Sequence, residues 1–438
     1  MKVAIYTLGC KVNQFETAAM ERELTARGHE LVPFDDPADA YIVNTCTVTA
    51  VSDKKSRNTI RRAQKRSPHA VVAVCGCYGQ TDPEAVAALG VDLVAGTAGR
   101  MAFLDTLEEK CREKQAAHAA AATVTVDEAL RRRSFEALSA GGMEGRTRAY
   151  LKVEDGCVNF CSYCIIPYAR GPVRSLPLDA AVAQAKQLAE EGYREIILTG
   201  IEISSWGHTF RDGTSLLDLL EAICAAVPAL RIRLGSLEPR TITEGFCRRA
   251  ALLPNLCPHF HLSLQSGCDA TLKRMNRKYD SARYYESVKL LREYFRGPAV
   301  TTDLIVGFPQ ETEEEFTETL AFIRKCAFSS MHIFPYSRRP GTPAAAMDGQ
   351  IPRAEQESRA HRAAAAADEM EQSYLRGLVG TVLPVLFEEE KDGFWRGHTP
   401  QYIEVRVKGE HLHNQLRPVT ITAAGDSLAY GTVKEEQP

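Results

Sequence analysis

Cys157, Cys161 and Cys164 bring three thiols into a stretch of eight residues, CVNFCSYC. Three thiolates this close together can hold one metal centre. Zinc sites usually take four protein ligands, and the next histidine along the chain, His208, is distant in sequence. A 4Fe-4S cluster held by three thiolates leaves one iron open to a substrate or cofactor. The spacing therefore favours an iron–sulfur cluster, with zinc or three structural thiols as the alternatives.

Whether the remaining cysteines form disulfides depends on the compartment where the protein works. The chain has 13 cysteines in 438 residues. Its beginning, MKVAIYTLGC, has too short an apolar stretch for a secretory signal. No run of about 18 uncharged apolar residues predicts a membrane span. We therefore expect a cytoplasmic protein with reduced thiols rather than a disulfide framework.

A second group of cysteines follows predicted strands in the first hundred residues. Short apolar runs alternate there with helical stretches, which is typical of a parallel sheet covered on both faces; they are residues 2–6, 40–44, 70–74 and 91–96. Cys10, Cys46 and Cys77 follow the first three runs. Because the carboxyl ends of parallel strands share one edge, these thiols should meet at the ligand-binding edge. Cys75 is the alternative to Cys77, but it lies inside the predicted strand.

The elements that position the first group begin near Ala149. Six strand candidates alternate with helices and predict a complete or partial parallel barrel; they are residues 149–155, 195–200, 231–236, 259–265, 299–307 and 330–336. Cys157, Cys161 and Cys164 follow the first of them, at the end of the barrel where chemistry is expected. Four short alternating strands in the tail predict a small all-β barrel. We expect domains at 1–126, 149–372 and 373–438, with 127–148 as a linker.

The motif Cys157-x-x-x-Cys161-x-x-Cys164, with an aromatic residue before its third cysteine, resembles that of the radical SAM superfamily. The resemblance implies a 4Fe-4S cluster whose open iron binds S-adenosylmethionine (SAM). One electron then cleaves SAM to a 5′-deoxyadenosyl radical, so the cofactor carries the hard chemistry and the protein positions it.

Further motifs resemble the methylthiotransferase family over nearly the whole chain. LGCKVNQFET, NTCTVT and CGCYGQ are similar to its N-terminal domain, which precedes a radical SAM core and an RNA-binding TRAM barrel. HLSLQSG, LKRMNRKY, DLIVGFPQETEEEF and PYSRRPGTPA are similar to that core. The resemblance implies that Cys10, Cys46 and Cys77 hold a second 4Fe-4S cluster that handles sulfur. It also implies a fold with an N-terminal parallel α/β sandwich, a central partial (βα)6 radical SAM barrel and the TRAM barrel.

The residues after Cys10 distinguish branches of the family. Lys11-Val12-Asn13-Gln14 resembles the branch that methylthiolates carbon 2 of N6-threonylcarbamoyladenosine beside the tRNA anticodon. Isopentenylated tRNA adenosine and a ribosomal-protein aspartate are the alternative substrates within the family. A non-catalytic, metal-stabilised RNA-binding protein is the alternative from another class. Glu202 departs from the family pattern, in which His or Asn is expected after LTG.

The resemblance also implies residues that contact SAM: Tyr163, Gly200, Glu238, Ser263, Gln265 and Gly307. Ser263 and Gln265 end a predicted strand and could bond the ribose or the methionyl part. Gly307 would lie beside the adenine, although a glycine at a strand end often only eases a turn.

RNA contact must use a local patch, because the net charge is −3. Seven Lys and Arg residues stand between Lys54 and Arg66. Phosphate neutralisation dominates RNA affinity, and the phosphate-binding residues expected from this segment are Arg61, Arg62, Lys65 and Arg66. A solvated helix face is the alternative.

Two further arginines, Arg170 and Arg174, follow the cysteine loop. Guanidinium groups suit phosphate and carboxylate, so we expect them to contact RNA or cofactor, with salt bridges at the barrel rim as the alternative. The expected partners of the protein are the tRNA anticodon stem-loop and an electron donor such as flavodoxin or ferredoxin. The protein is expected to be a monomer.

Overall fold

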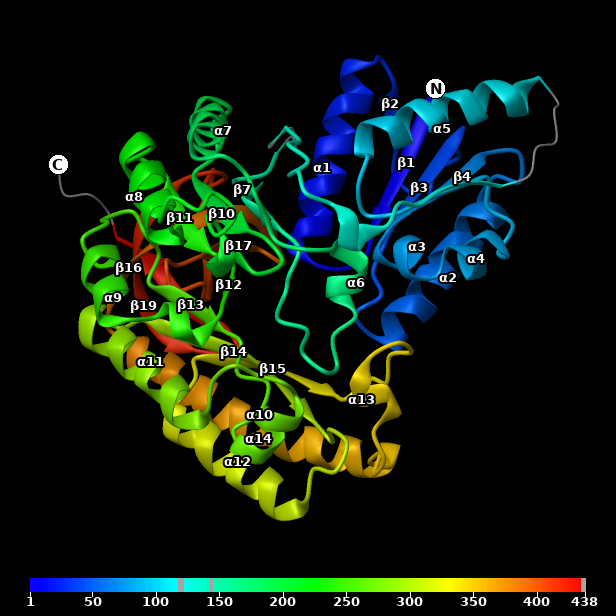
Figure 1. The fold of residues 1–438 in the computed structure, drawn as a ribbon. Helices are drawn as coiled ribbons and strands as arrows, with labels where there is room; N and C mark the ends of the chain where they lie inside the picture. Colours follow the sequence, from blue (N-terminus) through cyan, green and yellow to red (C-terminus); the bar gives the residue numbers. More distant parts are fainter. Residues whose placement is uncertain (117–121, 140, 142–144, 435–438) are drawn as a thin grey trace.

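The computed structural model describes residues 1–116, 122–139, 141 and 145–434. They form a parallel α/β sandwich, a partial α/β barrel and a small closed β-barrel, in chain order (Figure 1). This architecture confirms the predicted fold class. No helix in the described part of the chain is long and apolar enough to cross a membrane.

The N-terminal domain is built on a six-stranded parallel sheet. In pairing order its strands are β2 (Glu30–Leu31), β1 (Lys2–Thr7), β3 (Ala40–Thr45), β4 (Val71–Gly76), β5 (Leu93–Ala95) and β6 (Thr123–Thr125). Helices cover both faces, so β3 and β4 are buried along their whole length, and both begin with apolar runs. The short edge strands β2 and β6 were not expected, because so few residues carry no periodic pattern.

Two groups of helices flank this sheet. Side chains of α1 (Lys11–Ala26) and α5 (Arg100–Gln115) pack on one face. The other face is covered by α2 (Ala50–Arg66), with α3 (Cys77–Thr81) and α4 (Pro83–Ala87) beside it. Both α1 and α2 begin just after a strand ends, so their first residues lie at the carboxyl edge of the sheet.

The central domain contains the six predicted barrel strands, and their neighbours pair in parallel. They are β7 (Arg148–Lys152), β10 (Glu195–Thr199), β11 (Arg231–Leu234) continued by β12 (Ser236–Leu237), β13 (His259–Leu262), β14 (Ala299–Val306) and β15 (Ser330–Pro335). The third strand is broken at Gly235: β11 pairs with β10, whereas β12 pairs with β13. β7 and β15 end the series without pairing to each other, so the barrel is partial.

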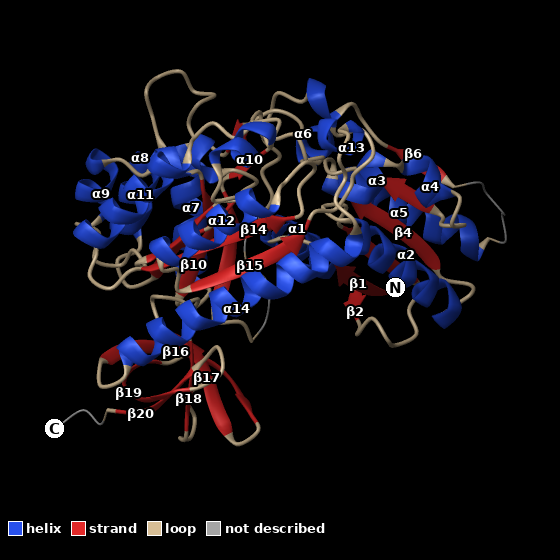
Figure 2. Cartoon of the chain, turned by 90° about the horizontal axis from the view of Figure 1, so that it is seen from below, coloured by secondary structure: helices blue, strands red, loops and turns tan. Residues whose placement is uncertain are grey.

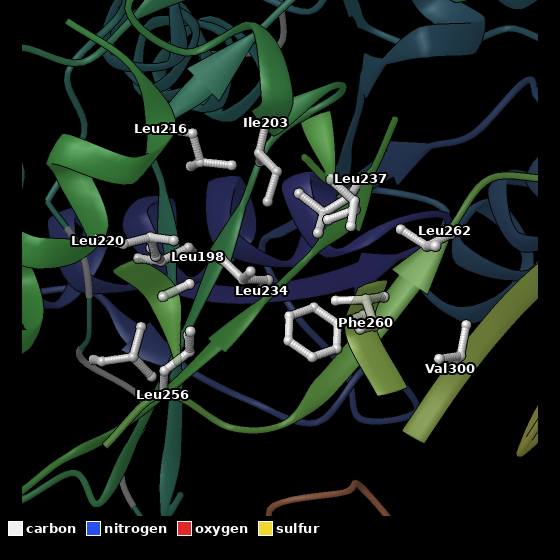
Figure 3. Packing of buried hydrophobic residues seen from close by; sticks show 14 of the residues in the cluster. Leu198, Ile203, Leu216, Leu220, Leu234, Leu237, Leu256, Phe260, Leu262 and Val300 are labelled. Atoms are coloured by element: carbon white, nitrogen blue, oxygen red, sulfur yellow. The ribbon is translucent and has the colours of Figure 1, made fainter. Parts of the chain in front are cut away.

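Helices pack on the outer face of this curved sheet. They are α7 (Leu178–Glu190), α8 (Leu216–Ala226), α9 (Glu244–Ala250), α10 (Asp269–Arg274), α11 (Ser281–Tyr294), α12 (Glu313–Cys326) and α14 (Arg353–Leu378). The buried side chains between strands and helices include Leu198, Leu234, Phe260 and Leu262 (Figure 3). Side chains alternate between the two faces along a strand, so Glu195 and Arg233 point away from these helices, to the opposite side of the sheet. We call this opposite side the inner face.

The N-terminal domain packs against the open side of the barrel through α1. Phe15 and Ala19 of α1 belong to the core of the central domain, although they lie far before it in sequence. The predicted linker 127–148 contains a short 3-10 turn, Ala129–Arg131, and the buried Leu138. Residues 140 and 142–144 of that linker lie outside the described residues.

The tail forms a closed five-stranded barrel, as predicted in class. Its strands are β16 (Val382–Lys391), β17 (Phe394–His398), β18 (Glu404–Val407), β19 (Leu416–Ala424) and β20 (Ala429–Val433). Figure 2 shows it at the end of α14, which continues to Leu378, past the expected start of this domain at 373. β17 was not predicted, because Arg396 and Gly397 break its apolar pattern.

Candidate active site

The loop 157–164 follows β7 and the two-residue strand β8 (Glu154–Asp155), as expected. Backbone and side chains hold it in place: Cys157 N donates to Gly171 O at 3.0 Å, and Ser162 Oγ donates to Arg274 O at 2.7 Å. Gly156 turns the chain into the loop at φ +97°, and a Cβ there would lie 2.1 Å from Pro172 O. Only glycine fits this approach of two backbones.

The three thiols of this loop lie in a low-dielectric setting with one cation beside them. Arg277 donates from Nη1 to the Sγ of Cys161 at 3.2 Å. Burial raises the pKa of the Cys157 and Cys164 thiols to about 12. A bound cationic centre is therefore required to keep them as thiolates near neutral pH.

The second group of cysteines meets at the carboxyl edge of the N-terminal sheet. Cys10 is the N-cap residue of α1, Cys46 follows β3, and Cys77 is the first residue of α3. Burial, against the opposing charge of Arg170 and together with the charges of Cys46 and Cys10, raises the pKa of Cys77 to about 12. Cys75 lies inside β4 and is fully buried, as expected of the alternative residue.

Two glycines allow this convergence. Gly9 has φ +112°, and a Cβ there would lie 2.9 Å from the Cβ of Cys46. Gly76 has φ +95°, and a Cβ there would lie 2.5 Å from Thr45 O. Each glycine directly precedes a cysteine of the group, so the tight turns bring the thiols of different strands to one place.

The chemistry of both donor sets fits an iron–sulfur centre. Each set offers three thiols, the soft ligands that such clusters use. Among the described residues, no three Cys, His, Asp or Glu side chains are close enough together for a single metal ion. Near the first loop, Glu154 Oε1 is buried without a hydrogen-bond partner, while Glu154 Oε2 accepts from Glu202 N at 2.7 Å. An open acceptor at this position suits the ammonium group of SAM.

A buried ion network joins the two cysteine sites. Glu16 of α1 is fully buried and pairs with Arg100 at 2.8 Å, with Lys152 at 3.2 Å and with Arg170. Arg170 ends α6 (Ile166–Arg170), directly after the first cysteine loop. These cations hold the pKa of Glu16 well below its usual range against the opposing effect of burial, which is the largest single influence. The network therefore ties the two domains together through fixed charges.

This network corrects the prediction that Arg170 and Arg174 contact RNA. Arg170 is fully buried, and Arg174 is buried against Asp155, with which it pairs at 3.2 Å. Neither guanidinium is accessible to a phosphate. The sequence correctly predicted that both arginines lie near the site. Inside the protein, however, Arg170 pairs with Glu16 and Arg174 pairs with Asp155, so neither positive charge is available to RNA.

Asn13 connects this network to the second cysteine site. It accepts from Arg170 Nη2 at 2.6 Å through its Oδ1. Its Nδ2 donates to Leu8 O at 2.8 Å and to Thr45 O at 2.9 Å, the backbones leading to Cys10 and Cys46. A single side chain thus spans the loops after β1 and β3. Neither Asn13 nor Glu16 was predicted, yet both are polar residues within the apolar stripe of α1, which is a signal of a buried role.

A second contact between the domains lies beyond Cys46. Arg339, in the loop after β15, pairs with Asp53 at 2.6 Å and donates to Thr47 Oγ1 at 2.6 Å. Ala50 N donates to Ser337 Oγ at 3.0 Å. The Cys46 loop is therefore held against the rim of the barrel.

The residues predicted to contact SAM are spread around the carboxyl ends of the barrel strands. Tyr163 is half-buried in the first cysteine loop, and Gly200 follows β10 beside Glu154. Glu238 follows β12 and pairs with Arg240 at 2.9 Å. Their contact with SAM stays a prediction.

The other three predicted SAM residues follow β13 and β14. Ser263 O accepts from Arg277 Nη2 at 3.3 Å. Gln265 adopts φ +70° and pairs through its backbone with β14. Gly307 adopts φ +69°, and a Cβ there would lie 2.5 Å from Gln356 Cγ of α14. A glycine is thus required at 307 for packing against α14, whatever its contact with adenine.

The four cations predicted to bind phosphate lie on α2 and are exposed; they are Arg61, Arg62, Lys65 and Arg66. Arg62 is partly engaged, since it pairs with Asp35 at 3.3 Å and lies over the ring of Phe34 at 4.9 Å. This helix begins just after Cys46, but the four cations lie in its last turns, shortly before β4 begins at Val71, and therefore at the edge of the sheet opposite the second cysteine site.

The inner face of the barrel carries polar groups that the sequence analysis did not assign. Arg233 donates to both oxygens of Glu195, at 2.7 Å and 3.0 Å, and to the carbonyl of Pro400 in the C-terminal barrel at 2.7 Å. His261 Nε2 lies 3.3 Å from Asp303 Oδ2. The C-terminal barrel therefore closes one end of the inner face.

Comparison with known proteins agrees with this geometry. A model of the radical SAM superfamily matches residues 151–323, and a model described as uncharacterized protein family UPF0004 matches residues 2–96. Among solved structures, the radical S-adenosylmethionine methyltransferase TsrM from Kitasatospora setae has a TM-score of 0.57 at 16% identity. That similarity covers 78% of this chain and 77% of TsrM. At such low identity it shows a shared fold only, and that fold is the radical SAM fold.

Curated relatives match over almost the full length. The threonylcarbamoyladenosine tRNA methylthiotransferase MtaB of Bacillus subtilis is 40% identical, covering 97% of this chain and 94% of that protein. MtaB of Aquifex aeolicus is 37% identical, covering 93% and 97%. The tRNA-2-methylthio-N(6)-dimethylallyladenosine synthase of Oleidesulfovibrio alaskensis is 34% identical, covering 96% of each chain.

The chain belongs to the methylthiotransferase family of radical SAM enzymes. The resemblance drawn from the motifs is confirmed, as is the prediction of 4Fe-4S clusters and SAM as cofactors.

Proposed function

We propose that this enzyme adds a methylthio group to carbon 2 of N6-threonylcarbamoyladenosine beside the anticodon of tRNA. The observation that carries the proposal is the pair of three-thiol sites on facing strand ends of two domains, joined by Glu16, Arg170 and Asn13. The names of the MtaB relatives support this modified nucleoside as the substrate.

We assign the two cysteine groups to two clusters. Cys157, Cys161 and Cys164 would hold the cluster that binds SAM, and Cys10, Cys46 and Cys77 the cluster that handles sulfur. Bound SAM supplies both the methyl group and, when reduced, the radical that removes hydrogen from carbon 2. The protein's own task is then to hold both centres at a fixed separation and to admit the base between them.

Groups of the chain around the first site would orient the cofactor. Glu154 offers a buried oxygen without a partner, and Glu202 lies beside it through its backbone. Burial raises the pKa of both carboxyls, and a cationic ligand beside them would favour their ionised form. Glu202, which departs from the family pattern, lies next to the proposed SAM site, where its carboxylate accepts hydrogen bonds from Ser204 N at 3.1 Å and from Ser205 Oγ at 2.7 Å.

The exposed cations at the C-terminal end of α2 would contact tRNA phosphates at a distance from the second site. Arg61, Lys65 and Arg66 are exposed at this end. The C-terminal barrel is a further RNA contact in this proposal. The electron donor would be a flavodoxin or ferredoxin, and the enzyme would act as a monomer in the cytoplasm, where tRNA is met.

The test is nucleoside mass spectrometry of tRNA from a strain that lacks the gene. Loss of 2-methylthio-N6-threonylcarbamoyladenosine, restored by the gene on a plasmid, is the expected result. Loss of the methylthio derivative of dimethylallyladenosine instead would assign the other tRNA substrate. Unchanged tRNA with a protein aspartate that loses its methylthio group would move the enzyme to the third branch.

A further inference from the structure

Lys11 reaches the inner face of the barrel from the neighbouring domain. It is the first residue of α1, and its side chain is half-buried. Its ammonium group interacts electrostatically with charges on several barrel strands: Arg148 on β7, Glu195 on β10, Arg233 on β11 and Asp303 on β14. The N-terminal domain thus contributes a cation to a surface made mostly by the central domain.

Both carboxylates near Lys11 are engaged elsewhere. Glu195 pairs with Arg233 at 2.7 Å and with Arg231 at 2.6 Å. Asp303 faces His261 at 3.3 Å. In the part of the chain that the structure describes, the Lys11 ammonium has neither an ion pair nor a hydrogen bond. The Lys11 ammonium is therefore available to pair with an anionic group that enters the inner face.

The Lys11 ammonium lies next to the proposed sulfur-handling site. Lys11 directly follows Cys10, and consecutive Cα atoms are about 3.8 Å apart. An adenine whose carbon 2 lies at the second cysteine site would therefore have its N6 substituent within reach of side chains near Cys10. In threonylcarbamoyladenosine that substituent ends in a carboxylate.

We propose that Lys11 binds the carboxylate of the threonylcarbamoyl group and determines which modified adenosine the enzyme accepts. This inference rests on the proposed function. A charge-assisted bond from the ammonium to the carboxylate replaces the water lost when the base enters.

The same residue would reject the other tRNA substrate of the family. A dimethylallyl group is neutral and apolar, so it would cover the Lys11 ammonium without offering an acceptor. A buried cation without a partner is costly, and a site built to bind a polar group rejects an analogue that lacks it. Lys11 thus acts by both attraction and exclusion.

The experiment compares reconstituted enzyme variants on defined RNA. Anticodon stem-loops carry N6-threonylcarbamoyladenosine, N6-dimethylallyladenosine or unmodified adenosine. The variants are Lys11→Met, Lys11→Arg and, as a matched control, Lys186→Met, whose lysine is exposed on α7. Stem-loop affinity, kcat/KM for methylthiolation, the KM for SAM and 5′-deoxyadenosine formation are measured for each. Iron content and melting temperature establish that each variant is folded and loaded.

Lys11→Met should lower kcat/KM for the threonylcarbamoyl stem-loop by roughly 100-fold, as expected when one partner of a buried charge pair is removed. Its affinity advantage over the unmodified stem-loop should disappear. Lys11→Arg keeps the charge and should lose less, while Lys186→Met should match the wild type.

Two results would overturn the inference while the proposed function stands. One is wild-type discrimination by Lys11→Met. The other is a higher KM for SAM with the RNA preference unchanged, which would assign Lys11 to the SAM carboxylate. Failure of the wild-type enzyme itself on the threonylcarbamoyl stem-loop would instead refute the proposed function.

Discussion

The two cysteine sites reach similar donor sets by different routes. In the central domain, one loop of eight residues, 157–164, carries all three thiols and is held by backbone contacts to Gly171 and Met275. In the N-terminal domain, Cys10, Cys46 and Cys77 come from the ends of three separate strands. The first site is a local property of the sequence, whereas the second exists only when the sheet is formed.

This difference has consequences for stability and function. A local loop keeps its spacing when distant parts of the molecule change. The strand-end site depends on Gly9, Gly76 and Asn13, and through Asn13 on Arg170 of the other domain. We therefore expect mutations between the domains to disturb the second site more than the first.

The largest expected effect separates the two sites directly. Replacing Cys157, Cys161 and Cys164 together by Ala should abolish 5′-deoxyadenosine formation, because the SAM-binding cluster loses its ligands. The protein should retain about half its iron if each site holds one cubane cluster. SAM cleavage at the wild-type rate by the reconstituted triple variant would refute the assignment of this loop.

Breaking the buried network should be the next largest effect. Arg170→Met removes one of the three cations paired with Glu16 and the donor to Asn13 Oδ1. Loss of one member of a buried ion pair costs about 3–5 kcal/mol when the other charge is left unpaired, and the remaining pairs of Glu16 with Arg100 and Lys152 should keep the loss below that range. Denaturant unfolding measures this loss. Methylthiolation should fall further than SAM cleavage, since the variant disturbs the second site. The exposed Arg248, which pairs with Glu244, provides the control, and Arg248→Met should change stability little.

The same network predicts a pH dependence. The pKa of Glu16 is held well below its usual range in the folded protein. A depressed carboxyl pKa contributes stability above the unfolded value of about 4.3, and this contribution is lost as pH falls towards the folded value. The free energy of unfolding of the wild type should therefore decline on acidification below about pH 4. Glu16→Gln should be less stable at neutral pH and should lack this part of the decline.

A smaller effect tests the turns of the strand-end site. Gly76→Ala places a Cβ 2.5 Å from Thr45 O at φ +95°, whereas Gly28→Ala at φ +81° meets nothing within 4 Å. Both substitutions strain the backbone by about 1–3 kcal/mol, but only the first displaces the strand that leads to Cys46. Gly76→Ala should lower iron retention and methylthiolation, and Gly28→Ala should keep both. Equal iron retention in the two variants would contradict the proposed role of the turn.

The smallest effect concerns RNA affinity. Neutralising Arg61, Arg62, Lys65 and Arg66 together should flatten the plot of log affinity for tRNA against log salt by up to roughly 3 in slope, because counterion release scales with phosphate contacts. Arg62 should contribute least, since Asp35 and Phe34 already engage it. An unchanged slope would leave α2 as a solvated helix face.

The sequence predicted what depends on local pattern. The barrel strands were found because their alternation is regular, and Cys10, Cys46 and Cys77 were grouped because parallel strands share one edge. It did not predict the burial of Arg170, whose partner Glu16 lies 154 residues earlier. The sequence around an arginine near a site does not show which group the arginine will pair with. An arginine at position 170 is therefore compatible with an RNA contact and with an internal ion pair. Only the packing of α1 on the barrel decides between them.

The measurement that tests the two-site account most directly is the product analysis of a Cys10→Ala, Cys46→Ala, Cys77→Ala triple variant, with Cys75→Ala as its control. The triple variant should keep about half its iron. It should cleave SAM to 5′-deoxyadenosine under strong reductant and yield no methylthiolated nucleoside. Cys75→Ala should form product, because its thiol lies inside β4. Methylthiolated nucleoside from the triple variant would contradict the account.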